Sequence, residues 1–245
     1  MLAGDGVRTT HMVVEEAQMD PDYVNSIPLS TYRFALSKKS LQVLDEIGSD
    51  PEYGGASDAG TMSMLYTLIH CCQMHRVLQL GTWIGFSALI LADALMKTND
   101  ENNPSVLYTV DPAIPQAMKA RAYIEEAGLS GVVHFVDGKS TDREVVEFLE
   151  AKAPCDLIYI DSYHGYSVAR EELRIYWPLV RFHGFLALHD SSEFAASFDP
   201  ENEGGVIRAL KEWIPLAPDC EALFMRQPVW QNPCGFFLGT KKELS

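Results

Sequence analysis

The sequence predicts a doubly wound α/β fold, with helices on both faces of a mostly parallel, seven-stranded sheet whose last strand is antiparallel. Between residues 61 and 213, short apolar runs without helical period alternate with segments whose apolar residues follow a helical period. This alternation is typical of a parallel sheet with crossover helices. The chain then ends in two apolar runs joined by Pro228–Cys234, which indicates a terminal hairpin.

Length and charge limit the possible partners. The 245 residues can bury a full core and fit one elaborated α/β domain better than two independent ones. Acidic residues outnumber basic ones by 34 to 19, so the formal charge is −15. Because such a surface repels phosphate backbones and anionic lipids, we expect neither nucleic acid nor a membrane as a partner.

Cysteine usage and the N-terminus indicate the compartment. The five cysteines include one adjacent pair, Cys71-Cys72, and have no regular spacing, which argues against a disulfide framework or a C-x-x-C metal site. The first residues lack the pattern of a signal peptide, and no apolar run is long enough to span a bilayer. We therefore expect a soluble, cytoplasmic protein.

Residues 1–59 are expected to form a flap and a helical lid in front of a catalytic domain at residues 60–245. Residues 1–28 are polar and acidic, without period. Thr31–Ile47 has the spacing of an amphipathic helix and is followed by Gly48, and residues 49–60 form a loop rich in glycine. Because this helix has an apolar face to bury, it would cover the active site or build a contact in a homodimer.

The remaining elements follow from apolar spacing and from glycine and proline stops. Strands are expected at residues 77–80, 106–110, 132–136, 156–160, 185–188, 221–227 and 235–240. Helices are expected at residues 61–75, 87–95, 116–127, 141–152, 168–177 and 205–213.

The turn between the first strand and its helix has the spacing of a nucleoside site. Gly81 and Gly85 lie between the strand and Ser87, so free backbone N–H groups and the positive end of a helix would face a ligand above the strand. A dinucleotide fingerprint has a glycine where Trp83 stands, so a pyrophosphate would meet an indole. The turn therefore fits a nucleoside ligand without phosphates, or it is an ordinary strand-to-helix turn.

Acidic and imidazole side chains follow three further strands. Asp111 ends the second strand, where it can accept hydrogen bonds from ribose hydroxyls or cap the next helix. Asp161 and His164 follow the fourth strand, and His189-Asp190 follows the fifth. Because ligands of open α/β sheets bind beyond the carboxyl ends of the strands, Asp161, His164 and Asp190 should converge. We expect His189 to be a structural hydrogen-bonding group.

These motifs, in this order, resemble a known family. Leu78–Ser87 resembles the first motif of class I S-adenosylmethionine (SAM)-dependent methyltransferases, and the D-x-x-H-x-Y, W-P-L-V and H-D series resembles a subgroup related to small-molecule O-methyltransferases. The resemblance extends from Gly60 to the C-terminus. It departs from the family at Gln79 and Lys139, where acidic residues are usual. It implies a Rossmann-like methyltransferase fold with a SAM site formed by Gly81, Thr82, Trp83, Gly85, Ser87, Asp111, Gly138, Ser140 and Asp161.

The resemblance also implies methyl transfer to a hydroxyl of a small molecule, for which the acceptor must lose its proton to a base or to a metal. Asp161 and Asp190 can hold a divalent cation such as Mg²⁺ through oxygen ligands, although Ser191 replaces the asparagine usual in metal-dependent relatives. His164, with Asp161, is the candidate catalytic base. The sequence leaves open N-methylation, hydroxylase-like chemistry and a non-catalytic SAM-binding protein. An aromatic acceptor pocket would be lined by Trp83, Tyr163, Tyr166, Phe194 and Trp230.

Overall fold

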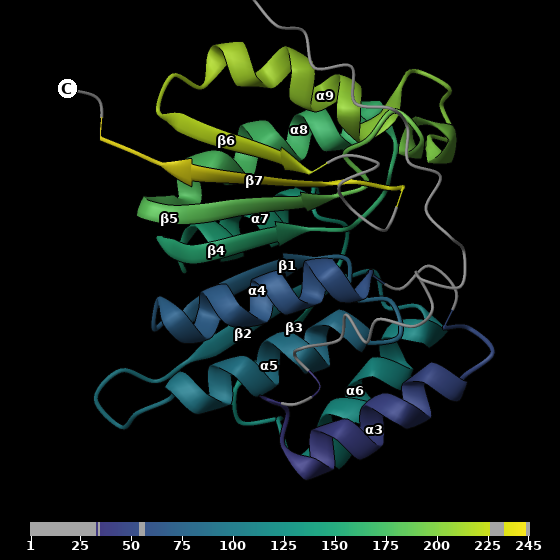
Figure 1. The fold of residues 1–245 in the computed structure, drawn as a ribbon, viewed down its shortest axis with the longest axis vertical. Coiled ribbons are helices and arrows are strands. Elements are labelled where there is room, and N and C mark those ends of the chain that lie inside the picture. Colours follow the sequence, from purple (N-terminus) through teal and green to yellow (C-terminus); the bar gives the residue numbers. More distant parts are fainter. Residues whose placement is uncertain (1–32, 34, 54–56, 226–232, 244–245) are drawn as a thin grey trace, which may run out of the picture.

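The computed structural model describes residues 33, 35–53, 57–225 and 233–243. Within them lies a seven-stranded sheet of order β3-β2-β1-β4-β5-β7-β6 (Figure 1). The strands are β1 (Arg76–Leu80), β2 (Val106–Asp111), β3 (Val133–Asp137), β4 (Cys155–Ile160), β5 (Val180–His189), β6 (Cys220–Met225) and β7 (Phe236–Lys241). Only β7 runs against its neighbours, so the predicted fold class is confirmed.

Seven α-helices have full bounds in the described part of the chain. They are α3 (Lys38–Ser49), α4 (Ala59–Cys71), α5 (Phe86–Thr98), α6 (Pro115–Ala127), α7 (Arg143–Glu150), α8 (Tyr166–Tyr176) and α9 (Gly205–Trp213). Short 3₁₀ turns lie at Trp177–Leu179, Ala195–Phe198 and Ile214–Leu216. No described helix has the length and apolar character that crossing a membrane would require.

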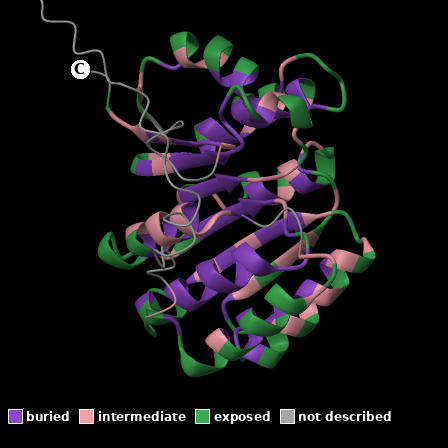
Figure 2. Ribbon diagram, turned by 45° about the vertical axis from the view of Figure 1, so that its right-hand side comes forward, coloured by how far each residue is buried: buried purple, intermediate pink, exposed green. Residues whose placement is uncertain are grey.

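Alternating side chains of the central strands pack into two separate cores. Val77 and its partner Leu157 face a core shared with α3 to α6, whereas Leu78 and Ile158 face a core shared with α7 to α9. Figure 2 shows the result, with buried residues along the sheet and exposed residues on the outer sides of the helices. The two layers of helices leave the carboxyl ends of the strands as the open edge of the sheet.

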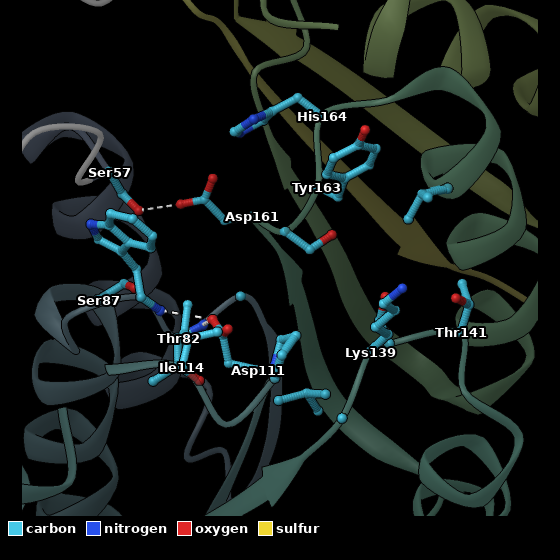
Figure 3. A pocket seen from close by; sticks show the side chains of 18 of the residues that line it. Ser57, Thr82, Ser87, Asp111, Ile114, Lys139, Thr141, Asp161, Tyr163 and His164 are labelled. Carbon is cyan, nitrogen blue, oxygen red and sulfur yellow. Dashed lines mark hydrogen bonds between the residues drawn. The ribbon is translucent and has the colours of Figure 1, made fainter. Parts of the chain in front are cut away.

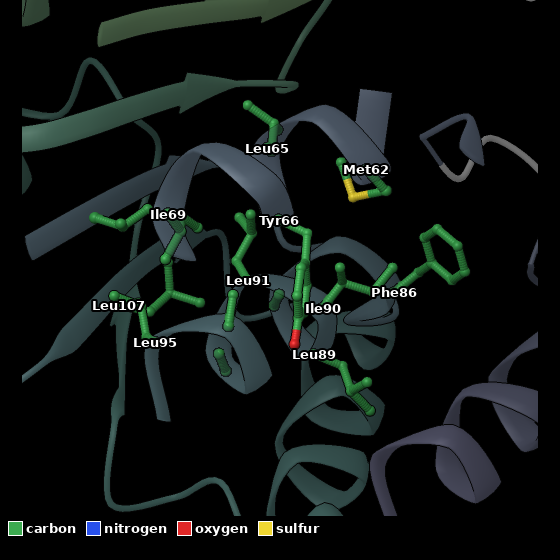
Figure 4. Close-up of a cluster of buried hydrophobic side chains, with 14 of the residues drawn as sticks. Met62, Leu65, Tyr66, Ile69, Phe86, Leu89, Ile90, Leu91, Leu95 and Leu107 are labelled. Carbon is green, nitrogen blue, oxygen red and sulfur yellow. The ribbon is translucent and has the colours of Figure 1, made fainter. Parts of the chain in front are cut away.

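The apolar face of α3 belongs to the first core. Val43, Leu44 and Ile47 are buried in the same cluster as the α4 and α5 side chains drawn in Figure 4, among them Leu65, Ile69 and Leu91. The amphipathic pattern is therefore confirmed for α3, but the predicted helix is interrupted: residues 33 and 35 are helical, whereas residues 36 and 37 are not, and the predicted start at Thr31 lies outside the described residues. The helix α3 begins at Lys38, because the side chain of Ser37 accepts a hydrogen bond from the amide of Ser40.

Most other elements lie close to their predicted positions. The main exception is β5, which begins at Val180 because Val180 pairs with Cys155 across a register shift near the start of β4. A cap residue explains the start of α4, because the side chain of Asp58 accepts a hydrogen bond from the amide of Thr61. The predicted flap at residues 1–28 and most of the connection before β7 lie outside the described residues.

Candidate active site

A cavity of about 730 Å³ opens at the carboxyl ends of β1 to β4. Figure 3 shows Thr82 and Asp111 toward one end of it and Asp161 and His164 toward the other. Most residues predicted for the SAM site line it: Gly81, Thr82, Trp83, Ser87, Asp111, Gly138, Ser140 and Asp161. Neither Gly85 nor Asp190 is among its lining residues. The structure therefore brings together side chains from four strand ends that are far apart in sequence.

The two glycines of the turn after β1 have steric roles. Gly81 has φ +93°, and a Cβ placed on it would lie 1.9 Å from the carbonyl oxygen of Asp161. Gly85 has φ +90°, and its Cβ would lie 2.8 Å from the Cβ of Ala120 in α6. Both positions therefore require glycine, because a side chain would clash as well as strain the backbone. Gly85 serves the packing of α5 against α6, which explains why it does not line the cavity.

Gln79, where the family has an acidic residue, supports this turn from within the protein. Its amide nitrogen donates to the carbonyl oxygen of Gly81 at 2.6 Å and to the hydroxyl of Ser87 at 2.7 Å. The side chain is fully buried. Gln79 therefore fixes the turn, and its amide does what a carboxylate could not, since it donates to two oxygen atoms.

Asp111 also holds the turn. One of its carboxylate oxygens accepts from the amides of Thr82 at 2.8 Å and Trp83 at 2.9 Å, and the other makes no hydrogen bond to a described residue. Burial raises the pKa of Asp111, although the two amides act in the opposite direction. The alternative that Asp111 caps the next helix is wrong, because the N-cap of α6 is Ile114. The expectation of free N–H groups at residues 82 and 83 is also wrong, since Asp111 occupies them.

A cluster of charged side chains lies at the other end of the cavity, where two of its members, Asp161 and His164, line the wall. One ligand atom from each of Asp161, His164 and Asp190 lies within 4.8 Å of the others, which confirms that the three converge. The Nε2 of His164 lies 2.7 Å from Asp190. Burial lowers the pKa of His164, but the hydrogen bond and charge of Asp190 outweigh it, and the pKa is raised. The two imidazoles beside Asp190 hold its pKa low despite its burial.

His189, expected to be a structural group, lies inside this cluster. Its Nε2 is 3.1 Å from Asp58, and its Nδ1 is 3.3 Å from Asp190 and 3.4 Å from Asp161. Burial opposes the charged form, but three carboxylates raise the pKa of His189 well above its usual value. The two nitrogens of His189 therefore link Asp58 on one side to Asp161 and Asp190 on the other, where three carboxylates favour the charged form of the imidazole.

Three further contacts of this cluster escaped the sequence analysis. Asp161 accepts hydrogen bonds from the hydroxyls of Ser57 at 2.6 Å and Tyr159 at 3.0 Å. Asp58, which binds His189, precedes it by 131 residues. The only sequence signal for Asp58 is its position as a helix cap, which says nothing of the distant histidine.

The donor set suits a divalent cation. Two carboxylates and one imidazole converge, and three carboxylates face only two imidazoles, so the cluster can take a further positive charge. Ser191, beside Asp190, has a buried hydroxyl without a hydrogen-bond partner among the described residues. Asp161 and Asp190 are therefore chemically suited to the role predicted for them.

The predicted aromatic pocket is partly assembled. Trp83 and Tyr163 line the cavity, and the indole of Trp83 donates to the carbonyl of Glu52. Phe194 packs against Phe198, whose ring centroid lies 6.1 Å from that of His164. Tyr166 is buried and donates to Glu212, away from the cavity. Trp230 lies outside the described residues.

Comparisons with known proteins agree with this geometry. Residues 78–191 match a family model described as a methyltransferase domain. A catechol O-methyltransferase from Niastella koreensis is 35% identical over 100 residues, which cover 40% of this chain and 42% of that protein. The match therefore spans less than half the length of this curated relative.

Solved structures share the fold over most of the chain. The O-methyltransferase TomG from Streptomyces achromogenes, involved in tomaymycin synthesis and solved with SAM, is 20% identical with a TM-score of 0.65, covering 84% of this chain and 88% of that one. An O-methyltransferase from Bacillus cereus, solved with S-adenosylhomocysteine (SAH), is 18% identical with a TM-score of 0.66, covering 90% and 96%.

Proposed function

We propose that this chain, which belongs to the class I SAM-dependent methyltransferases, transfers a methyl group from SAM to a hydroxyl of a small molecule. The observation that supports this most is the division of one cavity into two ends. The glycine turn, Asp111 and the loop at Gly138–Ser140 form one end, and Asp161 with His164 forms the other. Such a cavity can place a bound methyl donor directly beside an acid–base cluster.

The first end suits the nucleoside of SAM. The unoccupied carboxylate oxygen of Asp111 can accept from a ribose hydroxyl, while Ile114 and Val110 offer apolar walls for a base. Trp83 stands where a pyrophosphate would need to approach the backbone. The same residues therefore favour SAM over a dinucleotide.

The second end suits deprotonation of a hydroxyl. In the transfer step the acceptor oxygen bonds to the methyl carbon, the carbon–sulfur bond breaks with its electron pair on sulfur, and SAH leaves. The hydroxyl proton must go to a base, and the candidate is Nδ1 of His164, because Nε2 donates to Asp190; Asp161 and Asp190 would stabilise the imidazolium formed. A divalent cation held by Asp161 and Asp190 would lower the pKa of the hydroxyl.

The proposal is tested by SAH release from SAM in the presence of phenols, sugars and amines. Turnover with a hydroxyl acceptor is expected, with inhibition by EDTA and recovery in Mg²⁺. Turnover with amines alone would favour N-methylation, and SAH binding without turnover on any acceptor would favour a binding protein. Full activity in EDTA would refute a role for the cation. His164 would then act as the base, with Asp161 orienting its imidazole.

We also propose that residues 1–59 act as a lid over the site or build a contact in a homodimer, and that the protein is cytoplasmic. Ser57 and Asp58 reach into the charged cluster, which connects the end of this segment to the site. Deletion of residues 1–59 should therefore lower turnover strongly, and it should also cost stability because α3 packs into the core. Equal turnover in the truncated and full-length proteins would refute the lid, and a monomer by light scattering would refute the dimer.

A further inference from the structure

Glu172 of α8 is a buried carboxyl group for which the proposed chemistry has no use. Its side chain is almost completely buried, and one of its oxygens, Oε2, has no hydrogen-bond partner among the described residues. No lysine or arginine of the described chain forms an ion pair with it. Because an unpaired buried carboxyl group costs stability, a leucine or methionine would be the simpler choice in this core.

The other oxygen of Glu172 joins two strand ends. Oε1 accepts hydrogen bonds from the hydroxyls of Ser140, after β3, and Ser162, after β4. Both serines line the cavity. One turn further along α8, Tyr176 donates to the carbonyl oxygen of Ser140. The helix therefore holds this wall of the cavity from behind.

The direction of these hydrogen bonds determines what the wall offers to a ligand. A serine hydroxyl has one hydrogen to donate and two lone pairs that accept. When both hydrogens go to an ionised Glu172, each serine can only accept from a ligand. A ligand group that contacts Ser140 and Ser162 must then be a hydrogen-bond donor. A carbonyl oxygen in that position would face the lone pairs of the two hydroxyls and would make no hydrogen bond.

We infer that Glu172 is a positioning residue that makes Ser140 and Ser162 obligate acceptors and thereby selects the amino group of an adenine over the carbonyl group of its deaminated counterpart. This inference rests on the proposed function, since it requires the nucleoside of SAM to lie between Asp111 and Ser140.

The test compares the affinities for SAH and for S-inosylhomocysteine, measured by calorimetry at pH 8. The wild-type protein should bind SAH about tenfold tighter or more, as expected when one buried polar group would be left unpaired. Glu172→Met releases the two hydroxyl hydrogens, so the ratio should fall to within about threefold of unity. Glu172→Gln keeps an acceptor oxygen and should retain the preference, and the exposed neighbour change Glu171→Gln is the control.

Thermal melting first establishes that each variant is folded. An unchanged ratio in folded Glu172→Met would overturn the inference, and a double Ser140→Ala, Ser162→Ala variant with full preference would also do so. Equal loss of preference in Glu172→Met and Glu172→Gln would assign the effect to charge or packing and overturn it as well. Failure of the wild-type protein to bind either compound would overturn the proposed function itself.

Discussion

The two ends of the cavity are built by different means. At the proposed SAM end, glycine geometry and a single carboxylate shape the backbone: Gly81 and Gly85 adopt positive φ, and Asp111 binds two successive amides. At the acceptor end, side chains from three distant segments balance one another's charge: Asp58, Asp161 and Asp190 surround His189. The first end is stabilised by backbone geometry and hydrogen bonds within a turn. The second end is stabilised by ion pairs between residues that are far apart in the sequence. Changes at the two ends should therefore have separable effects.

The substitution Asp161→Asn is expected to have the largest effect on kcat with the least effect on SAH affinity. Loss of this carboxylate should lower kcat by about 10³-fold or more, because it removes both a candidate cation ligand and a partner of His189. SAH affinity should stay nearly unchanged, since the nucleoside site proposed at Asp111 lies at the other end of the cavity (Figure 3). Steady-state kinetics and calorimetry measure the two quantities. Asp137→Asn, an exposed acid at the tip of β3, is the matched control, and full activity of Asp161→Asn would refute its role.

A smaller loss of rate is expected from His164→Ala. A positioned base contributes about 10²–10⁴-fold, so kcat should fall by this factor with little change in SAH affinity. The exposed His70 provides the control substitution His70→Ala. If His164→Ala retained the wild-type kcat, the proton would have to leave by another route.

Asp111→Ala should show the opposite pattern. Removing this acceptor should weaken SAH binding by about 1.5–3 kcal/mol, whereas kcat at saturating SAM should fall little. The turn itself loses two hydrogen bonds, so a melting curve accompanies the calorimetry. Unaltered affinity in the folded variant, or tight binding of NAD to the wild-type protein, would contradict the assignment of this end to a nucleoside without phosphates.

The smallest effect concerns stability and pH. Burial raises the pKa of Glu172 from its ordinary 4.5 to about 7, although the two serines and the charge of His164 act against this rise. The folded protein therefore binds this proton more tightly than the unfolded chain, and the stabilisation present at low pH is lost as the pH rises from about 4.5 to 7. Relative to Glu172→Gln, the wild-type protein should lose about 2–3 kcal/mol of unfolding free energy between pH 5 and 8.

Urea unfolding at several pH values measures this difference. The control is again Glu171→Gln on the exposed side of α8, where Arg174 lowers the pKa of Glu171, so no change in this pH range is expected. Parallel pH profiles of the wild type and Glu172→Gln would show that Glu172 stays charged throughout.

The same contrast explains what the sequence could predict. The fold and the proposed SAM end could be predicted from local features of the sequence. These are the periodic spacing of apolar residues, the glycines and prolines that end helices, and the spacing of Gly81 and Gly85. Asp161, His164 and Asp190 could be placed because the ends of adjacent parallel strands meet at one edge. Ser57, Asp58 and the role of His189 could not, because their contacts depend on how α4 approaches the sheet. The sequence also did not show that Gln79 bonds Gly81 and Ser87, or that Glu172 bonds two serines. These hydrogen bonds depend on which groups surround each buried side chain in the folded protein.

The contact between Gly81 and Asp161 has a consequence for engineering. The two loops touch backbone to backbone, with no space for even a methyl group between them. Under the proposed function, this main-chain contact would fix the position of the SAM-binding turn relative to the loop that faces the acceptor. Attempts to redirect the enzyme to new acceptors should leave this junction intact and vary the outlying aromatic residues Phe194 and Phe198. Libraries that include Gly81 would lose the alignment of the two reactants before they altered selectivity.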